Sequence, residues 1–139
     1  MSMPPKPGTE TILVVDDEIA VLSLTNMMLT RYGYTIITAA SAKEALHLFE
    51  VWPDLSVDLL LVDIIMPEMN GIELATRLRE LRPDLPALYF SAYSDQAPLR
   101  PIFARKLPYI AKPFTSLQLT KRIREVLDEP KTSAASGEE

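Results

Sequence analysis

Residues 59–71 read LLLVDIIMPEMNG, and this stretch decides the fold of the chain. Residues 57–62 predict a strand with apolar side chains on both faces, and Asp63 ends that strand. A turn follows, and a helix is predicted over 71–81. A strand buried on both faces is typical of a parallel sheet covered by helices on either side, so this stretch indicates the centre of an α/β fold.

The same alternation of strand and helix continues on both sides of this stretch. Further strands are predicted over 11–15, 34–38, 87–90 and 108–110, and further helices over about 18–32, 41–51 and 115–128. Right-handed crossovers between parallel strands then predict a doubly wound five-stranded sheet in a three-layer α/β/α sandwich. Pro98 and Pro101 each remove a backbone donor, which disfavours a regular helix over 94–104.

Several helix ends are encoded by local signals. Gly33 suits the left-handed position that ends the first helix, and Asp17 is expected to cap the start of that helix. Later helices begin with pairs that are expected to cap each other reciprocally, namely Ser41 with Glu44, Asn70 with Glu73, and Thr115 with Gln118. The predicted breaks therefore rest on more than hydrophobic periodicity.

The composition fits one domain with short tails. A chain of 139 residues holds one ordinary domain, and we expect a flexible tail over 1–10, the domain over 11–128 and a second tail over 129–139. The absence of cysteine excludes disulfides, thiolate metal sites and thiol catalysis. The N-terminal residues lack a signal-peptide core, and the longest apolar stretch is too short for a membrane span.

These features also limit the expected location and partners. A net charge of −5 argues against a sequence-independent grip on nucleic acid. We therefore expect a cytoplasmic domain that inserts into no membrane, binds no nucleic acid directly and exists as a monomer or weak dimer.

The residues just past the predicted strands are polar. They are Asp16 and Asp17, Asp63, Ser91, and Lys112 followed by Pro113. Because ligands of open α/β sheets bind at the carboxyl ends of the strands, we expect these groups to converge. Three adjacent carboxylates need a counter-charge. A hard cation such as Mg²⁺ suits their oxygen ligands, and the lysine adds a second positive group.

These groups match a phosphoryl-transfer site, in which a metal ion and an ammonium neutralise the charge of an in-line displacement. Asp63 is the predicted nucleophile, forming an aspartyl phosphate, because it stands alone at the end of the central strand. Each group has an ordinary interpretation when taken alone, as a helix cap, a turn residue or a surface charge, and His47 is expected on the solvent side of its helix. Their shared position at one end of successive strands favours a common site.

Four motifs in this order resemble the receiver domain of bacterial two-component response regulators. They are VVDDE at 14–18, LLLVDIIMPEMNGIEL at 59–74, FSAYS at 90–94 and YIAKPF at 109–114. The resemblance covers about residues 10–128 and implies a flavodoxin-like sheet with the strand order 2-1-3-4-5.

The resemblance also implies a role for each matching residue. Asp63 is the implied phosphoacceptor, and Ser91 is the hydroxyl that binds the phosphoryl group. Lys112 is the lysine of the family's site, with a cis bond to Pro113, and Tyr109 is the aromatic switch that rotates inward when the serine moves. The implied Mg²⁺ ligands are Asp16, Asp17, Asp63 and the backbone carbonyl of Ile65.

By the same resemblance, the phosphodonor is a phosphohistidine on a sensor histidine kinase or a histidine phosphotransfer domain. The domain would catalyse only its own phosphorylation and dephosphorylation. Ile65 and Tyr93 occupy positions that influence the approach of hydrolytic water, and an apolar and a bulky side chain there are expected to slow dephosphorylation.

Two other functions are weighed against this one. A pseudo-receiver would be an interaction module with an inactive site, which the complete set of site residues disfavours. An aspartyl-phosphate hydrolase of the haloacid-dehalogenase type would need a second aspartate where Ile65 stands. Whether the receiver stands alone or belongs to a hybrid sensor kinase stays open, and so do its cognate kinase and its downstream protein target.

Overall fold

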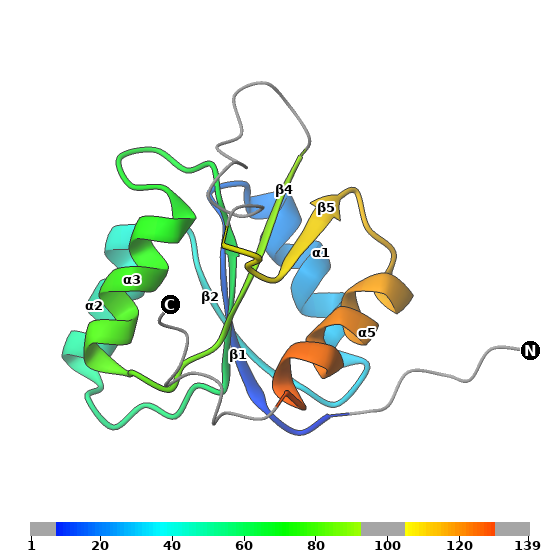
Figure 1. The fold of residues 1–139 in the computed structure, drawn as a ribbon, viewed down its shortest axis with the longest axis horizontal. Helices are drawn as coiled ribbons and strands as arrows, with labels where there is room; N and C mark the ends of the chain where they lie inside the picture. Colours follow the sequence, from blue (N-terminus) through cyan, green and yellow to red (C-terminus); the bar gives the residue numbers. More distant parts are fainter. Residues whose placement is uncertain (1–7, 93–104, 130–139) are drawn as a thin grey trace, which may run out of the picture.

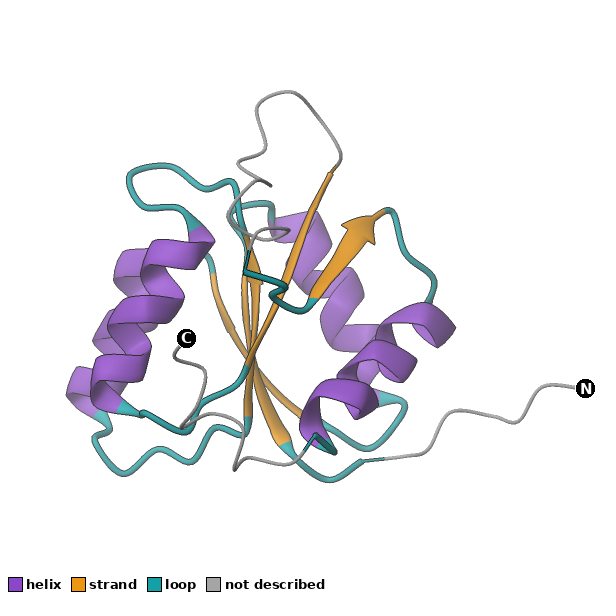
Figure 2. Ribbon diagram, in the orientation of Figure 1, coloured by secondary structure: helices purple, strands orange, loops and turns teal. Residues whose placement is uncertain are grey.

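The computed structural model describes residues 8–92 and 105–129, which form a five-stranded parallel sheet with helices on both faces (Figure 1, Figure 2). The strand order is β2-β1-β3-β4-β5, which confirms the predicted doubly wound α/β fold and its topology. The elements are β1 (Thr11–Val15), α1 (Ile19–Thr30), β2 (Thr35–Ala39), α2 (Ala42–Val51), β3 (Leu59–Asp63), α3 (Gly71–Leu81), β4 (Ala87–Ala92), β5 (Tyr109–Lys112) and α5 (Ser116–Leu127).

The central strand β3 separates two hydrophobic cores. All of its residues are buried, and it pairs with β1 on one side and β4 on the other. Leu60 and Val62 belong to the core under α2 and α3, whereas Leu59 and Leu61 belong to the core under α1 and α5. Figure 1 shows these two helix pairs on opposite faces of the sheet. Burial of each leucine contributes roughly 1.5–3 kcal/mol, so this strand anchors Asp63 firmly at its end.

The predicted reciprocal caps are confirmed for α5 and differ at α2. Thr115 and Gln118 form a complete capping box. The Ser41 side chain accepts from the Glu44 amide at 3.1 Å as expected, but the Glu44 carboxylate accepts from the amide of Ala40 at 2.7 Å. The Glu44 carboxylate thus binds the amide of the residue before the N-cap, because the chain arriving from β2 presents that amide to it.

The start of α3 is fitted closely to the end of β3. Asn70 accepts from the Glu73 amide at 2.8 Å, but the Glu73 carboxylate lies 3.6 Å from Arg77 on the next turn, so the reciprocal bond predicted here is wrong. At Gly71 a Cβ atom would meet the backbone carbonyl of Asp63, with the carbonyl carbon only 2.9 Å away. Glycine is therefore required where the helix passes the strand end.

The first helix is capped differently from the prediction. Its N-cap residue is Glu18, which makes no side-chain cap bond. The buried Asp16 carboxylate instead accepts from the Glu18 amide at 2.8 Å, and Asp17 stays exposed. The predicted capping role of Asp17 is therefore wrong, because the aspartate before it reaches the amide first. Gly33 has a φ of 97°, as expected for the left-handed position after this helix.

The first and last described segments meet at one side chain. Gly8, the first described residue, is buried, and its amide donates to the backbone carbonyl of Tyr32 at 3.0 Å. The Arg124 guanidinium on α5 lies 2.9 Å from the Glu10 carboxylate and 2.5 Å from the Asp128 carboxylate. One arginine therefore ties the segment before β1 to the end of the last helix.

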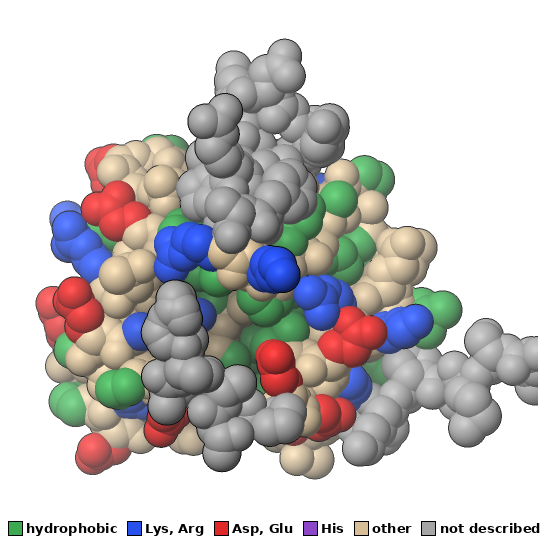
Figure 3. All heavy atoms as spheres, in the orientation of Figure 1, with side chains coloured by type: hydrophobic (Ala, Val, Ile, Leu, Met, Phe, Trp, Pro, Cys, Tyr) green, Lys and Arg blue, Asp and Glu red, His purple; other side chains and the backbone are tan. Residues whose placement is uncertain are grey.

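The described surface carries mixed charge. On the face in Figure 3, both acidic and basic side chains are exposed, and several of the basic ones lie next to one another near the middle of the view. Among the described helices, none is long and apolar enough to cross a membrane. The predictions for Tyr93 and for the segment 94–104 lie outside the described residues.

Candidate functional site

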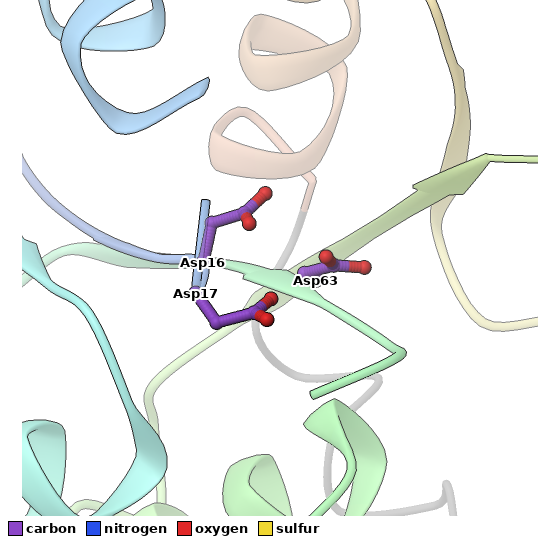
Figure 4. Close-up of side chains that lie close together, drawn as sticks. All are labelled: Asp16, Asp17 and Asp63. Atoms are coloured by element: carbon purple, nitrogen blue, oxygen red, sulfur yellow. The ribbon is translucent and has the colours of Figure 1, made fainter. Parts of the chain in front are cut away.

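Three carboxylates lie together at the ends of two neighbouring strands. Figure 4 shows Asp16 and Asp17 beyond the end of β1 and Asp63 at the end of β3. Val15 pairs with Val62 in the sheet register, which puts the residues that follow them side by side. Carboxylate oxygens of the three aspartates lie within 4.8 Å of one another. Asp16 is fully buried and Asp63 is 5% exposed, so two of the three negative charges are shielded from water.

Lys112 is the counter-ion of this cluster. It ends β5, and its Nζ donates to Asp16 Oδ2 at 2.9 Å and to Asp63 Oδ2 at 3.3 Å. The Glu18 carboxylate lies farther away, at 3.7 Å from the same Nζ atom. The lysine side chain is 15% exposed, so these contacts are only weakly screened by solvent.

One ammonium does not balance the cluster. Burial raises the pKa of Asp63 to about 6, and the charge of Asp16 adds to the rise, while Lys112 and the Ile65 amide oppose it. Burial also raises the pKa of Asp16. For Lys112, burial acts to lower the pKa, but its bond to Asp16 and the charge of Asp63 outweigh burial, so the pKa is raised. The site therefore holds excess negative charge, which a cation would stabilise.

The donor set fits Mg²⁺. The three aspartates offer only hard carboxylate oxygens, which Mg²⁺ prefers. Asp17 is exposed, so the site opens to solvent and can keep the water ligands that Mg²⁺ retains. The backbone carbonyl of Ile65 stays a prediction as a further ligand; the structure shows the amide of that residue donating to Asp63 Oδ1 at 3.2 Å.

Ser91 and Tyr109 lie on the strands next to the cluster. Ser91 is buried on β4, directly after Phe90, which pairs with Asp63 in the sheet. The Tyr109 hydroxyl on β5 donates to the backbone carbonyl of Ser91 at 3.1 Å. The Lys112–Pro113 peptide bond is cis, as the resemblance implied.

Two neighbours of Lys112 were missed from the sequence. Glu18 directly follows the aspartate pair, so its acidity and position were a usable signal. Phe90 lies under the lysine, with Nζ 4.9 Å from the ring centroid. The sequence around Phe90 indicates only a buried strand residue, because the contact depends on how a side chain of β5 crosses β4.

The model of the response regulator receiver domain family matches residues 12–124. The chain belongs to this family. This receiver domain is 37% identical over 127 residues to the sensor kinase CckA of Brucella abortus, covering 87% of this chain and 13% of that protein. It spans about half or less of the length of the curated relatives that it matches.

Solved structures agree with this assignment. A CheY-like response regulator receiver domain protein from Methanospirillum hungatei superposes with a TM-score of 0.76 at 31% identity, covering 91% of this chain and 98% of that one. The response regulator TrrA of Thermotoga maritima, in complex with Mg²⁺ and BeF, superposes with a TM-score of 0.70 at 31% identity, covering 84% and 98%. The receiver domain is thus a signalling domain of the two-component type, as the motifs predicted.

Proposed function

We propose that this receiver domain accepts a phosphoryl group on Asp63 from a phosphohistidine, with Mg²⁺ bound, and signals through altered protein contacts. The donor is a sensor histidine kinase or a histidine phosphotransfer domain. The observation that carries the proposal is the buried Asp63 carboxylate, which lies 3.3 Å from the Lys112 ammonium and within 4.8 Å of a second and third carboxylate suited to a metal.

The geometry supports an in-line transfer. A carboxylate oxygen of Asp63 attacks phosphorus, and the phosphorus–nitrogen bond to the donor imidazole breaks. The electron pair of that bond stays on the imidazole nitrogen, which takes a proton from solvent. Lys112 is placed to pair with a phosphoryl oxygen, and the Ser91 hydroxyl is proposed to bind another. Asp16, Asp17 and Asp63 would hold Mg²⁺, which would supply further charge neutralisation for the phosphoryl group.

The proposed switch runs from Ser91 to Tyr109. Movement of the serine toward the phosphoryl group would shift the backbone carbonyl that the tyrosine hydroxyl now binds at 3.1 Å. Tyr109 also lines a surface cleft of about 460 Å³ formed by β5, Pro113 and α5. A rotation of the tyrosine would change the shape of this cleft, which offers a route to partner recognition.

The central test is phosphotransfer from a panel of phosphorylated histidine kinases. With Mg²⁺, a cognate kinase is expected to label the wild-type domain, and Asp63→Asn is expected to take up no label because it lacks the nucleophilic carboxylate. Autoradiography of the separated proteins measures the transfer. Label that stayed on the variant would refute Asp63 as acceptor. No label from any donor, acetyl phosphate included, would favour the pseudo-receiver.

The donor is proposed to dock on α1, beside the carboxylates. This helix contains no charged residue, and Ile19, Leu24 and Met27 are each more than half exposed. Leu24→Glu is expected to slow transfer from the cognate kinase by about tenfold, because burying a charge at an apolar interface is costly. Phosphorylation by acetyl phosphate should not change. Trp52→Ser serves as the control, since this similarly exposed apolar residue follows α2, which covers the opposite face of the sheet from α1.

Ile65 is proposed to shield the acyl phosphate from water. It is partly buried, and its amide binds the Asp63 carboxylate. Ile65→Asn is expected to increase the rate of phosphate release several-fold, because an amide can hold a water molecule where the isoleucine excludes one. The decay of pre-formed phosphoprotein measures this rate, and Ile65→Val is the control. Equal decay of all three proteins would contradict the proposal. Tyr93, assigned a similar role, lies outside the described residues.

A further inference from the structure

The ammonium of Lys112 lies over an aromatic ring. Its Nζ atom is 4.9 Å from the centroid of the Phe90 ring. Phe90 is fully buried on β4 and directly precedes Ser91. The same ammonium also pairs with the carboxylates of Asp16 and Asp63. The Glu18 carboxylate lies 3.7 Å from the same Nζ atom, so the ammonium is surrounded by three acids and one ring.

The ring is held in place by the elements that carry the site. The backbone carbonyl of Phe90 accepts from the Ile64 amide at 3.0 Å, directly after Asp63. The Phe90 ring packs against Phe114 with the centroids 5.8 Å apart and the planes tilted by 48°. Phe114 follows Lys112 by two residues, so the ring is fixed both to the strand of the acceptor and to the segment of the lysine.

An aromatic ring attracts an ammonium without carrying a negative charge, whereas a carboxylate attracts it through such a charge. A cation within about 6 Å of a ring centroid is attracted by the ring quadrupole, and more strongly when the cation is partly desolvated. The Lys112 side chain is 15% exposed, so it meets this condition. A further carboxylate in place of the ring would hold the lysine only by adding negative charge to a site that already has an excess of it. The ring orients the ammonium without adding charge.

We propose that Phe90 is a positioning residue, whose ring holds the Lys112 ammonium in place to meet the phosphoryl group on Asp63. This inference rests on the proposed phosphorylation. In this role Phe90 acts through the lysine. An aliphatic residue of similar size would fill the core but would allow the ammonium to pair with Asp16 alone.

The first test is spectroscopic and needs no phosphorylation. Protons above an aromatic ring resonate upfield, so the ε-methylene protons of Lys112 are expected to be shifted upfield in the wild-type domain. Their signal is identified by its loss in Lys112→Arg. Phe90→Leu should return it to the position of an exposed lysine, and Phe90→Tyr should keep the shift. Leu88→Val, which alters the same hydrophobic core two residues earlier on β4, should leave it unchanged.

The second test measures phosphorylation by acetyl phosphate at saturating Mg²⁺. Phe90→Leu is expected to lower the phosphorylation rate constant about tenfold, which equals about 1.4 kcal/mol and lies in the range of a partly desolvated cation–π contact. Phe90→Tyr should restore the rate, and saturating Mg²⁺ keeps the metal site filled in every variant. Circular dichroism confirms that each variant is folded.

The outcomes separate the two proposals. An unshifted lysine signal in the wild type, an unchanged rate in Phe90→Leu, or an equal loss in Leu88→Val would overturn the role of Phe90. A wild-type domain that takes no phosphoryl group would overturn the proposed function, whereas the upfield signal would still report the ring over the lysine.

Discussion

Lys112→Met is expected to destabilise the metal-free domain by roughly 3 kcal/mol at pH 7, because removing one partner of a buried ion pair leaves the other charge uncompensated. Two nearly buried carboxylates, those of Asp16 and Asp63, now share this lysine. Urea unfolding in the presence of a chelator, followed by circular dichroism, measures the change.

The same variant is expected to bind Mg²⁺ more tightly than the wild type. The lysine and the metal compete for the same carboxylate oxygens, so removing the ammonium frees negative charge for the ion. Isothermal calorimetry measures the affinity, and Lys121→Met, an exposed lysine on α5, is the control. Unchanged stability together with weaker Mg²⁺ binding would show that Lys112 does not balance the acids.

Asp63→Asn is expected to change stability in the opposite direction. Burial raises the pKa of Asp63 from 3.8 to about 6, a rise that corresponds to about 3 kcal/mol of destabilisation once the carboxyl is ionised. The asparagine keeps an oxygen for the Ile65 amide and carries no charge. We therefore expect the variant to be more stable than the wild type by about 3 kcal/mol at pH 7 without metal.

The gain of Asp63→Asn depends on pH. Because the folded domain holds the Asp63 proton more tightly than the unfolded chain does, the wild type is stabilised by protonation below pH 3.8, and this contribution is lost as the pH rises through about 6. The difference between variant and wild type should therefore be largest at pH 7 and small near pH 4. A difference that grew on acidification would contradict the raised pKa. Saturating Mg²⁺ should reduce it at neutral pH.

Local patterns in the sequence predicted where the strands end and which residues stand at those ends. The unbroken apolar run before Asp63 identifies a central strand, and the aspartates past two strands must then lie at the same edge of the sheet. The Thr115 and Gln118 cap also depends only on residues of one turn. These strand ends and caps depend on residues that are close in sequence, so hydrophobic periodicity and residue spacing are enough to predict them.

Contacts between side chains of segments that are distant in the chain could not be predicted from the sequence. The residue type favours Asp17 as the cap of α1, and only the folded structure shows that the buried Asp16 carboxylate accepts from the Glu18 amide instead. The approach of Gly71 to the carbonyl of Asp63 depends on the angle at which α3 leaves β3. The ring of Phe90 meets Lys112 only because β4 and β5 are neighbours in the folded sheet, and no spacing along the chain encodes that contact.

Arg124 has a consequence for how the domain can be combined with others. Since it holds both Glu10 and Asp128, the chain arrives and departs within the reach of one guanidinium. Glu10 directly precedes β1 and Asp16 directly follows it, so the first attachment point and the aspartates lie at opposite ends of that strand. The domain can therefore be joined to neighbouring modules at either terminus or inserted between two of them, because both ends of the fold lie close together at Arg124.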